Sequence, residues 1–136
     1  MKQPVRSFLL FITILSSVIF SNCTGTSPEY SRYQSLLKNQ IQEMANVLNA
    51  GHYKEFMTNY VSPSYISTMG GVDAALLNFD NSKQQSLYRA LNAARNIEPL
   101  YEANSKTMTY ISSDLSRPIV FRLQGGKWYL TDDMFL

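Results

Sequence analysis

A single change of hydrophobic period restricts the fold of this chain more than any other feature. From residue 28 to residue 96, apolar side chains recur every three or four positions, as on one face of an α-helix. From residue 97 onward they alternate with a period of two, which is typical of strands packed on one side. Helices followed by strands, without alternation of the two, predict an α+β domain.

The first helix has clear signals at both ends. Ser27 and Pro28 place a hydroxyl at the N-cap and a proline at the first helical position. Gly51 suits the position just after a helix. These signals predict a helix over residues 28–50. Its apolar stripe, with steps of four, four, three and four residues, consists of Tyr33, Leu37, Ile41, Met44 and Leu48.

Four further helices are predicted before the strands. Residues 52–60 form the first, and the next begins at Ser62, which precedes a proline and is followed after one or two turns by two glycines. Asp73 is expected to cap a short third helix. Ser82 is expected to cap a longer one over residues 83–96, whose apolar residues recur at helical spacing.

The last two strands can be aligned from their turn. Gly-Gly is a good two-residue hairpin turn, and centring the hairpin on residues 125–126 pairs Leu123 with Trp128 and Phe121 with Leu130. The large apolar side chains then share one face, an agreement that a one-residue slip would destroy. The opposite face is predicted to carry Arg122, Gln124, Tyr129 and Thr131.

The first two strands, over residues 97–103 and 106–112, are aligned in the same way. Centring on Asn104-Ser105 pairs Tyr101 with Met108 and Pro99 with Tyr110, and the proline predicts an edge strand. With strands over residues 119–124 and 127–131, we expect N-terminal helices packed on a curved, antiparallel, four-stranded sheet. The length of 136 residues suits one domain, which we place over residues 29–136.

Residues 1–22 have a different character. Lys2 and Arg6 precede an uninterrupted run of apolar and small hydroxyl residues over positions 8–20. As a helix this run would extend about 20 Å, whereas a bilayer core of roughly 30 Å needs about 20 residues. The segment therefore predicts a signal peptide rather than a membrane span.

The chain's single cysteine, Cys23, follows this segment directly. Phe-Ser-Asn-Cys resembles the bacterial lipobox, although Phe20 stands where leucine is common and Asn22 where glycine or alanine is common. The resemblance implies a lipidated Cys23, a short tether over residues 23–28, and anchorage in the cell envelope. Thr24 lacks the aspartate that resembles an inner-membrane retention signal, which favours the outer membrane. Cleavage after Gly25 and an uncleaved anchor remain alternatives.

Charge excludes one class of partner. The chain has 12 Lys and Arg against 10 Asp and Glu, and two of the basic residues lie in the signal segment, which leaves ten of each sign. No basic run or stripe remains, so we expect no nucleic-acid partner. With His52 as the only histidine and no second cysteine, we also expect no metal site and no cofactor.

The chain resembles the nuclear transport factor 2-like superfamily of cone-shaped, cystatin-like α+β domains over residues 29–133. Three segments carry the resemblance: NAGHYKEFMTNYVSP, ALNAARNIEPLYEANSKTMTYI and IVFRLQGGKWYLTDD. Members usually have a strand where residues 62–82 predict short helices, so the resemblance implies a reduced cone. It implies a pocket between helices and sheet but no particular activity, because the fold carries many functions.

Tyrosine is abundant, with nine residues, and its apolar ring and polar tip suit either a core or a ligand cavity. The candidates for lining a pocket are Tyr33, Tyr60, Tyr101 and Tyr110. His52 is interpreted as a surface or capping residue. Glu98 and Glu102 suit a polar sheet face, and Asp132 with Asp133 a solvated chain end, because neighbouring strand residues point to opposite faces.

No catalytic motif is present in the sequence, so an enzyme is not the leading hypothesis. We expect a non-enzymatic envelope lipoprotein that binds a small apolar ligand, a peptide or a partner protein. The second hypothesis is a ketosteroid-isomerase-like or dehydratase-like enzyme that uses a Tyr/Asp pair in the cone, with a buried carboxylate near a tyrosine hydroxyl. The third is a homodimer formed through an apolar outer face of the sheet.

Overall fold

The structure, a computed structural model, describes residues 27–131 and residue 135. The predictions for the signal segment, Cys23, Asp132 and Asp133 lie outside these residues. The helices are α1 (Pro28–Asn49), α2 (Tyr53–Tyr60), α3 (Pro63–Thr68), α4 (Val72–Leu77) and α5 (Asn81–Ala94). The strands are β1 (Leu100–Glu102), β2 (Thr107–Tyr110), β3 (Ile119–Gln124) and β4 (Lys127–Leu130). The predicted α+β class is confirmed.

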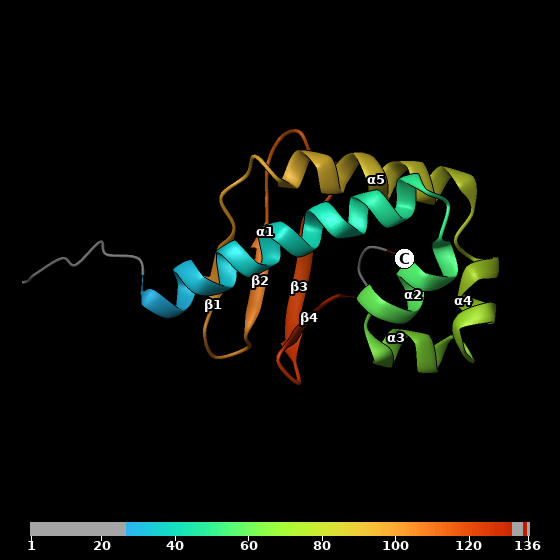
Figure 1. Cartoon of the computed structure of the whole chain (residues 1–136), viewed down its shortest axis with the longest axis horizontal. Helices are drawn as coiled ribbons and strands as arrows, with labels where there is room; N and C mark the ends of the chain where they lie inside the picture. The colour runs from blue at the N-terminus through green and yellow to red at the C-terminus, as the bar shows by residue number, and fades with distance from the viewer. Residues whose placement is uncertain (1–26, 132–134, 136) are drawn as a thin grey trace, which may run out of the picture.

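The helices and the sheet form two layers at one end of the molecule. Figure 1 shows α1 crossing one face of the sheet with α5 alongside it, while α2, α3 and α4 gather beyond the sheet. The sheet order is β1-β2-β3-β4 with every neighbouring pair antiparallel, so β1 and β4 are its edges. None of the helices in the described ranges is both long and apolar enough to span a membrane.

Helix α1 confirms the prediction for residues 28–50. The Ser27 hydroxyl accepts the Tyr30 N–H at 3.1 Å, as an N-cap should. Leu37, Ile41 and Met44 are fully buried, so the predicted stripe faces the core. The helix ends at Asn49, and Gly51, which follows the C-cap residue Ala50, has a φ of 75° that glycine adopts without strain.

Two of the predicted helix caps are wrong. The N-cap of α4 is Gly71, and Asp73 lies inside that helix. The N-cap of α5 is Asp80, whose carboxylate accepts the Lys83 N–H at 2.9 Å, so the predicted cap Ser82 lies in the first turn. A carboxylate at this position satisfies the free N–H and also opposes the positive end of the helix dipole, which explains why it is preferred over the hydroxyl two residues later.

The strand register follows the prediction. Leu123 pairs with Trp128, Phe121 with Leu130, and Tyr101 with Met108. The first strand is shorter than predicted: β1 begins at Leu100, so the expected Pro99–Tyr110 pair is not part of the ladder. Proline has no N–H to give to a ladder. The predicted edge position of the first strand is confirmed, because β1 is an outer strand of the sheet.

The inner face of the sheet forms the core with α1 and α5. Its buried residues are Met108, Tyr110, Ile119, Phe121, Trp128 and Leu130. The outer face carries the cross-strand row Leu100, Thr109 and Val120 beside a polar row that includes Glu102 and Arg122.

The far end of β4 departs from simple alternation. Thr131, predicted to lie on the polar face, is 8% exposed. Phe135, the one described residue beyond it, lies against the helices, where its ring stacks on that of Tyr65 at 4.9 Å and meets Phe79 edge-on at 5.8 Å.

Candidate functional site

A cavity of about 260 Å³ lies between α1 and the segment that joins α5 to β1. Helix α1 contributes Gln34, Lys38 and Ile41, which recur at steps of four and three residues and so lie on one face of the helix. The opposite wall begins at Ala94, the last residue of α5, and continues through residues 95–99. Tyr110, at the end of β2, closes the inner side.

The segment after α5 is fixed by hydrogen bonds at both of its ends. The N–H groups of Asn96 and Ile97 donate to the carbonyls of Ala93 and Ala94, both at 3.1 Å, and so close the end of the helix. At the other end, Glu98 Oε1 accepts from the Tyr30 hydroxyl at 2.8 Å and from Gln34 Nε2 at 3.0 Å. Two side chains of α1 therefore hold the outer wall of the cavity in place.

The hydroxyl of Tyr30 has hydrogen-bond partners. Its hydroxyl lies 2.8 Å from Glu98 Oε1 and 3.1 Å from the Pro99 carbonyl. Burial raises its pKa to about 12, and the hydrogen bond to Glu98 and the negative charge of that residue act in the same direction. The Tyr30 hydroxyl is therefore protonated in the folded protein, and as a hydrogen-bond donor it holds the outer wall of the cavity in place.

Tyr110 differs from Tyr30 in the hydrogen bonding of its hydroxyl. Its side chain is 2% exposed, and its ring meets Phe121 edge-on with centroids 6.0 Å apart. Its hydroxyl forms no hydrogen bond with any group among the described residues, although the side chain lines the cavity. Burial raises its pKa far above the ordinary value for tyrosine, and the nearby Tyr30 and Glu98 raise it further. Tyr110 therefore presents to the cavity an O–H donor that has no partner among the described residues.

Two cations border the same cavity. Lys38 on α1 and Arg95 at the C-cap of α5 are exposed, and neither forms an ion pair with a described acid. The single acid of the cavity lining, Glu98, is the one held by Tyr30 and Gln34. The lining thus carries two positive charges and one negative charge around partly apolar walls.

The four tyrosines predicted to line a pocket do not converge. Tyr110 borders the cavity just described. Tyr33 packs against Tyr101 at 5.8 Å and against Trp128 at 5.4 Å, forming an aromatic seam between α1 and the sheet. Tyr60 borders a separate open groove between α1, α2 and the β3–β4 hairpin, where Lys127 Nζ lies 5.5 Å from its ring centroid.

Sequence reasoning missed the polar part of the cavity. Gln34, Lys38 and Arg95 were not among its candidates, and Glu98 was expected on a sheet face with Glu102. Glu98 instead precedes β1 and binds α1, because the strand begins only at Leu100. The one signal in the sequence was the spacing of Gln34, Lys38 and Ile41, which places two polar side chains beside a core residue on one helix face.

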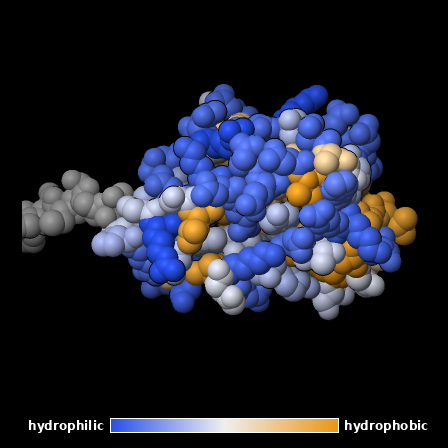
Figure 2. Space-filling model, viewed as in Figure 1, coloured by the Kyte–Doolittle hydropathy of each residue, from blue (hydrophilic) through white to orange (hydrophobic). Residues whose placement is uncertain are grey.

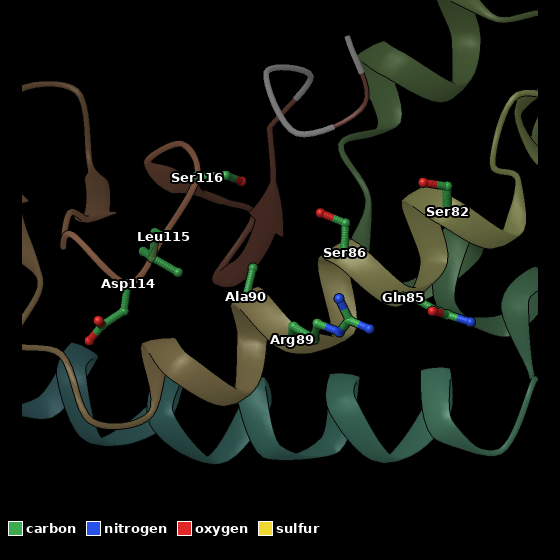
Figure 3. A pocket seen from close by; sticks show the side chains of 8 residues that line it. All are labelled: Ser82, Gln85, Ser86, Arg89, Ala90, Asp114, Leu115 and Ser116. Carbon is green, nitrogen blue, oxygen red and sulfur yellow. The ribbon is translucent and has the colours of Figure 1, made fainter.

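A second hollow, of about 420 Å³, lies between α5 and the loop that contains residues 114–116. Figure 3 shows its polar lining, with Arg89 and Asp114 projecting from opposite walls and not toward one another. Their side chains form no ion pair with each other in the part of the chain that the structure describes. The polar side chains that line this hollow are all exposed, unlike that of Tyr110, so it is the weaker candidate for a site.

Acidic and metal-ligating groups do not gather at either hollow. Every acidic residue between positions 27 and 131 is exposed. Within the described ranges, no three His, Cys, Asp or Glu side chains come close enough to hold a metal ion. His52 is the N-cap residue of α2, with its side chain 63% exposed and Nδ1 3.5 Å from Glu55 Oε2, which confirms the surface interpretation.

Comparisons of the chain with protein-family models, with curated proteins and with solved structures find no match.

Proposed function

We propose that the chain is a cell-envelope lipoprotein whose domain binds a small ligand in the cavity bordered by Tyr110. The observation that carries this proposal is the Tyr110 hydroxyl, which has no hydrogen-bond partner among the described residues and lies at the cavity on a side chain that is 2% exposed. Among the described residues, the fully enclosed side-chain atoms without a partner are Trp128 Nε1 and Thr131 Oγ1, so the Tyr110 hydroxyl is open to the cavity. A ligand in the cavity can supply the acceptor that the described residues do not.

The lipid anchor is proposed from the sequence around Cys23. The basic start, the short apolar run and the lipobox-like residues support export and diacylation, and Thr24 favours the outer membrane. Because α1 begins at Pro28, the tether would hold the first turn of α1 near the bilayer surface. Intact mass of the protein from native-type membranes tests this. A mass fitting residues 23–136 plus acyl chains, lost in Cys23→Ala, is expected; an unacylated protein would contradict the anchor.

We also propose that the domain is a reduced member of the nuclear transport factor 2-like superfamily. Its support is the order of elements: one long helix, a group of short helices, a further helix and a meander ending in a Gly-Gly hairpin. Residues 62–82 contain α3 and α4 where members usually have a strand. In such a cone the ligand would enter between the helices and the inner face of the sheet, which is where Tyr110 lies.

Ligand binding is favoured over the isomerase-like alternative by the position of the acids. That chemistry needs a carboxylate inside an apolar pocket, facing a tyrosine hydroxyl. The tyrosine–carboxylate contact at this cavity joins Tyr30 to Glu98, and Glu98 is exposed and already accepts two hydrogen bonds. A base in this position gains little from burial and does not face Tyr110 in a closed pocket.

The homodimer alternative has less support from the outer sheet face. Its apolar row of Leu100 and Val120, interrupted by Thr109, runs beside Glu102 and Arg122. Leu100 is 64% exposed, but charged neighbours break the surface into a small patch. The face of the molecule that carries α1 and α5 is mostly hydrophilic as well (Figure 2). Stable homodimer interfaces are larger and more apolar than this.

The binding function can be tested with one pair of variants. A set of small aromatic and aliphatic compounds is screened by thermal shift against the mature protein, and hits are measured by calorimetry. Tyr110→Phe removes only the hydroxyl at the cavity, whereas Tyr129→Phe removes one from the strand position that pairs with exposed Arg122. Weakened binding in Tyr110→Phe with unchanged binding in Tyr129→Phe is expected. Equal binding by both variants would contradict the proposed site.

A further inference from the structure

We propose that the cavity bordered by Tyr110 selects small organic anions, of which a monocarboxylate on an aromatic ring or short alkyl chain is the simplest type. This inference rests on the proposed ligand-binding function and names the chemical class of the ligand. It is carried by the arrangement of charges and donors around the cavity. The sequence alone suggests an apolar ligand instead.

The cavity provides room and apolar contact for a small body. Its volume of about 260 Å³ exceeds that of a cavity of roughly 150 Å³ that binds benzene. Ile41 and Ala94 lie beneath the lining and are almost fully buried, whereas Ile97 is a partly exposed apolar side chain of the opposite wall. A benzene ring with one substituent matches this size, whereas a steroid or a phospholipid chain does not.

The polar groups of the cavity suit an anion. The Tyr110 hydroxyl is a donor without an acceptor among the described residues, and its strongly raised pKa keeps the proton in place. Lys38 and Arg95 approach from different elements and have no acidic partner within the described ranges. A carboxylate accepts from all three kinds of donor, and a charged acceptor forms hydrogen bonds about twice as strong as a neutral one.

The one acid of the lining is held to the side of the cavity. Glu98 Oε1 receives both the Tyr30 hydroxyl and the Gln34 amide, so its charge is partly neutralised by these donors and fixed against α1. The cavity keeps an excess of one positive charge. A cationic ligand would meet Lys38 and Arg95 and would leave the Tyr110 donor unpaired, so the same groups disfavour amines.

Benzoate and benzamide test this selectivity, because they share size and shape and differ in charge. Calorimetry on the mature protein in nonionic detergent should give benzoate at least about tenfold tighter than benzamide, as expected when a charge-assisted bond replaces a neutral one. The double variant Lys38→Met with Arg95→Met should remove this preference, because benzoate should lose more affinity than benzamide. The matched control is Lys54→Met with Arg122→Met, which removes the same charge from exposed residues that do not line the cavity.

A charge change of opposite sign provides a second measurement. Glu98→Gln removes the negative charge and keeps an amide oxygen to accept from Tyr30. Benzoate affinity should rise about threefold, the effect of one exposed charge pair. A fall in benzoate affinity in this variant would contradict the inferred electrostatics.

Different results would contradict the anion selectivity and the ligand binding itself. If benzamide binds as tightly as benzoate and Tyr110→Phe weakens both, the cavity binds ligands but the inference about anions is overturned. If benzoate does not bind at millimolar concentration, or binds equally well after both cations are removed, the inference is also overturned. If Tyr110→Phe leaves binding of every hit unchanged, the proposed function itself fails.

Discussion

Tyr110 lines the cavity and Tyr30 binds its wall, but of the two hydroxyls only that of Tyr30 has hydrogen-bond partners among the described residues. It donates toward Glu98 and Pro99, at 2.8 and 3.1 Å. The Tyr110 hydroxyl is unpaired on a side chain that is 2% exposed. Substituting each tyrosine by phenylalanine removes the same single oxygen atom from both environments. The structure predicts that these two chemically identical changes shift the free energy of unfolding in opposite directions.

The expected magnitudes follow from the hydrogen bonds. An unpaired buried donor costs about 1–3 kcal/mol. We take the lower end for Tyr110, because its side chain borders a cavity, and expect Tyr110→Phe to stabilise the ligand-free protein by about 1 kcal/mol. For Tyr30, loss of a hydrogen bond to an exposed carboxylate should destabilise the protein by about 1 kcal/mol. In a domain of roughly 100 residues, each change corresponds to a shift in Tm of about 4 °C.

Urea unfolding followed by tryptophan fluorescence measures both variants. Trp128 is the single tryptophan of the chain, is 3% exposed, and packs against Tyr33, so its emission reports on the seam between α1 and the sheet. The comparison is valid if the free energy of unfolding falls with urea concentration at the same slope in both variants as in the wild type. A loss of about 1 kcal/mol or more in Tyr110→Phe would contradict this expectation, since it would show that the hydroxyl has a stabilising partner in the ligand-free protein.

Three further predictions test the core, a helix cap and a titration. Phe121→Ala, which empties a fully buried position at the centre of the inner sheet face, should destabilise the protein by about 3–5 kcal/mol in urea unfolding. Asp80→Ala should cost about 1 kcal/mol through loss of the α5 cap, whereas Ser82→Ala should change stability by less than about 0.5 kcal/mol; equal effects would contradict the assigned cap. The pKa of Tyr30 is raised to about 12 in the folded state, so its contribution to stability is complete below pH 10 and is lost as pH rises through 12. The free energy of unfolding of Tyr30→Phe should therefore fall less than that of the wild type between pH 10 and 12. An unchanged pH dependence would count against the contact with Glu98.

The parts of the fold that follow from the sequence are those set by local pattern. The stripe that begins at Tyr33 defines α1, and the Gly-Gly turn fixes the pairing of Leu123 with Trp128, because a slip by one residue would turn the apolar side chains outward. The helix caps were harder to predict. Asp80 and Ser82 are both good capping residues two positions apart, and only the extended backbone of Asp80, with ψ of 170°, decides between them.

The site was less accessible to sequence reasoning because it depends on contacts between distant segments. Alternation places Tyr110 on the inner face, but it places Tyr101 there as well, and Tyr101 packs against Tyr33 instead of lining the cavity. The difference arises from where α5 ends and how residues 95–99 cross to β1. That path depends on the hydrogen bond between Tyr30 and Glu98, which are separated by 68 residues. No periodicity within a single segment reveals such a contact.

The same contact holds the outer wall of the cavity in place. Ile41 and Tyr110 line the inner side of this cavity, and both side chains are almost completely enclosed by their neighbours. Tyr30 and Gln34 instead draw Glu98 toward the N-terminal part of α1, and the closed end of α5 fixes the other side of the segment. The wall is thus held at two points, and Tyr110 lines the space between them. Glu98→Ala, which releases one of these points, should therefore alter ligand affinity more than Glu102→Ala, whose carboxylate contacts only Ser105 among the described residues. Equal affinities in the two variants would show that the wall does not depend on this anchor.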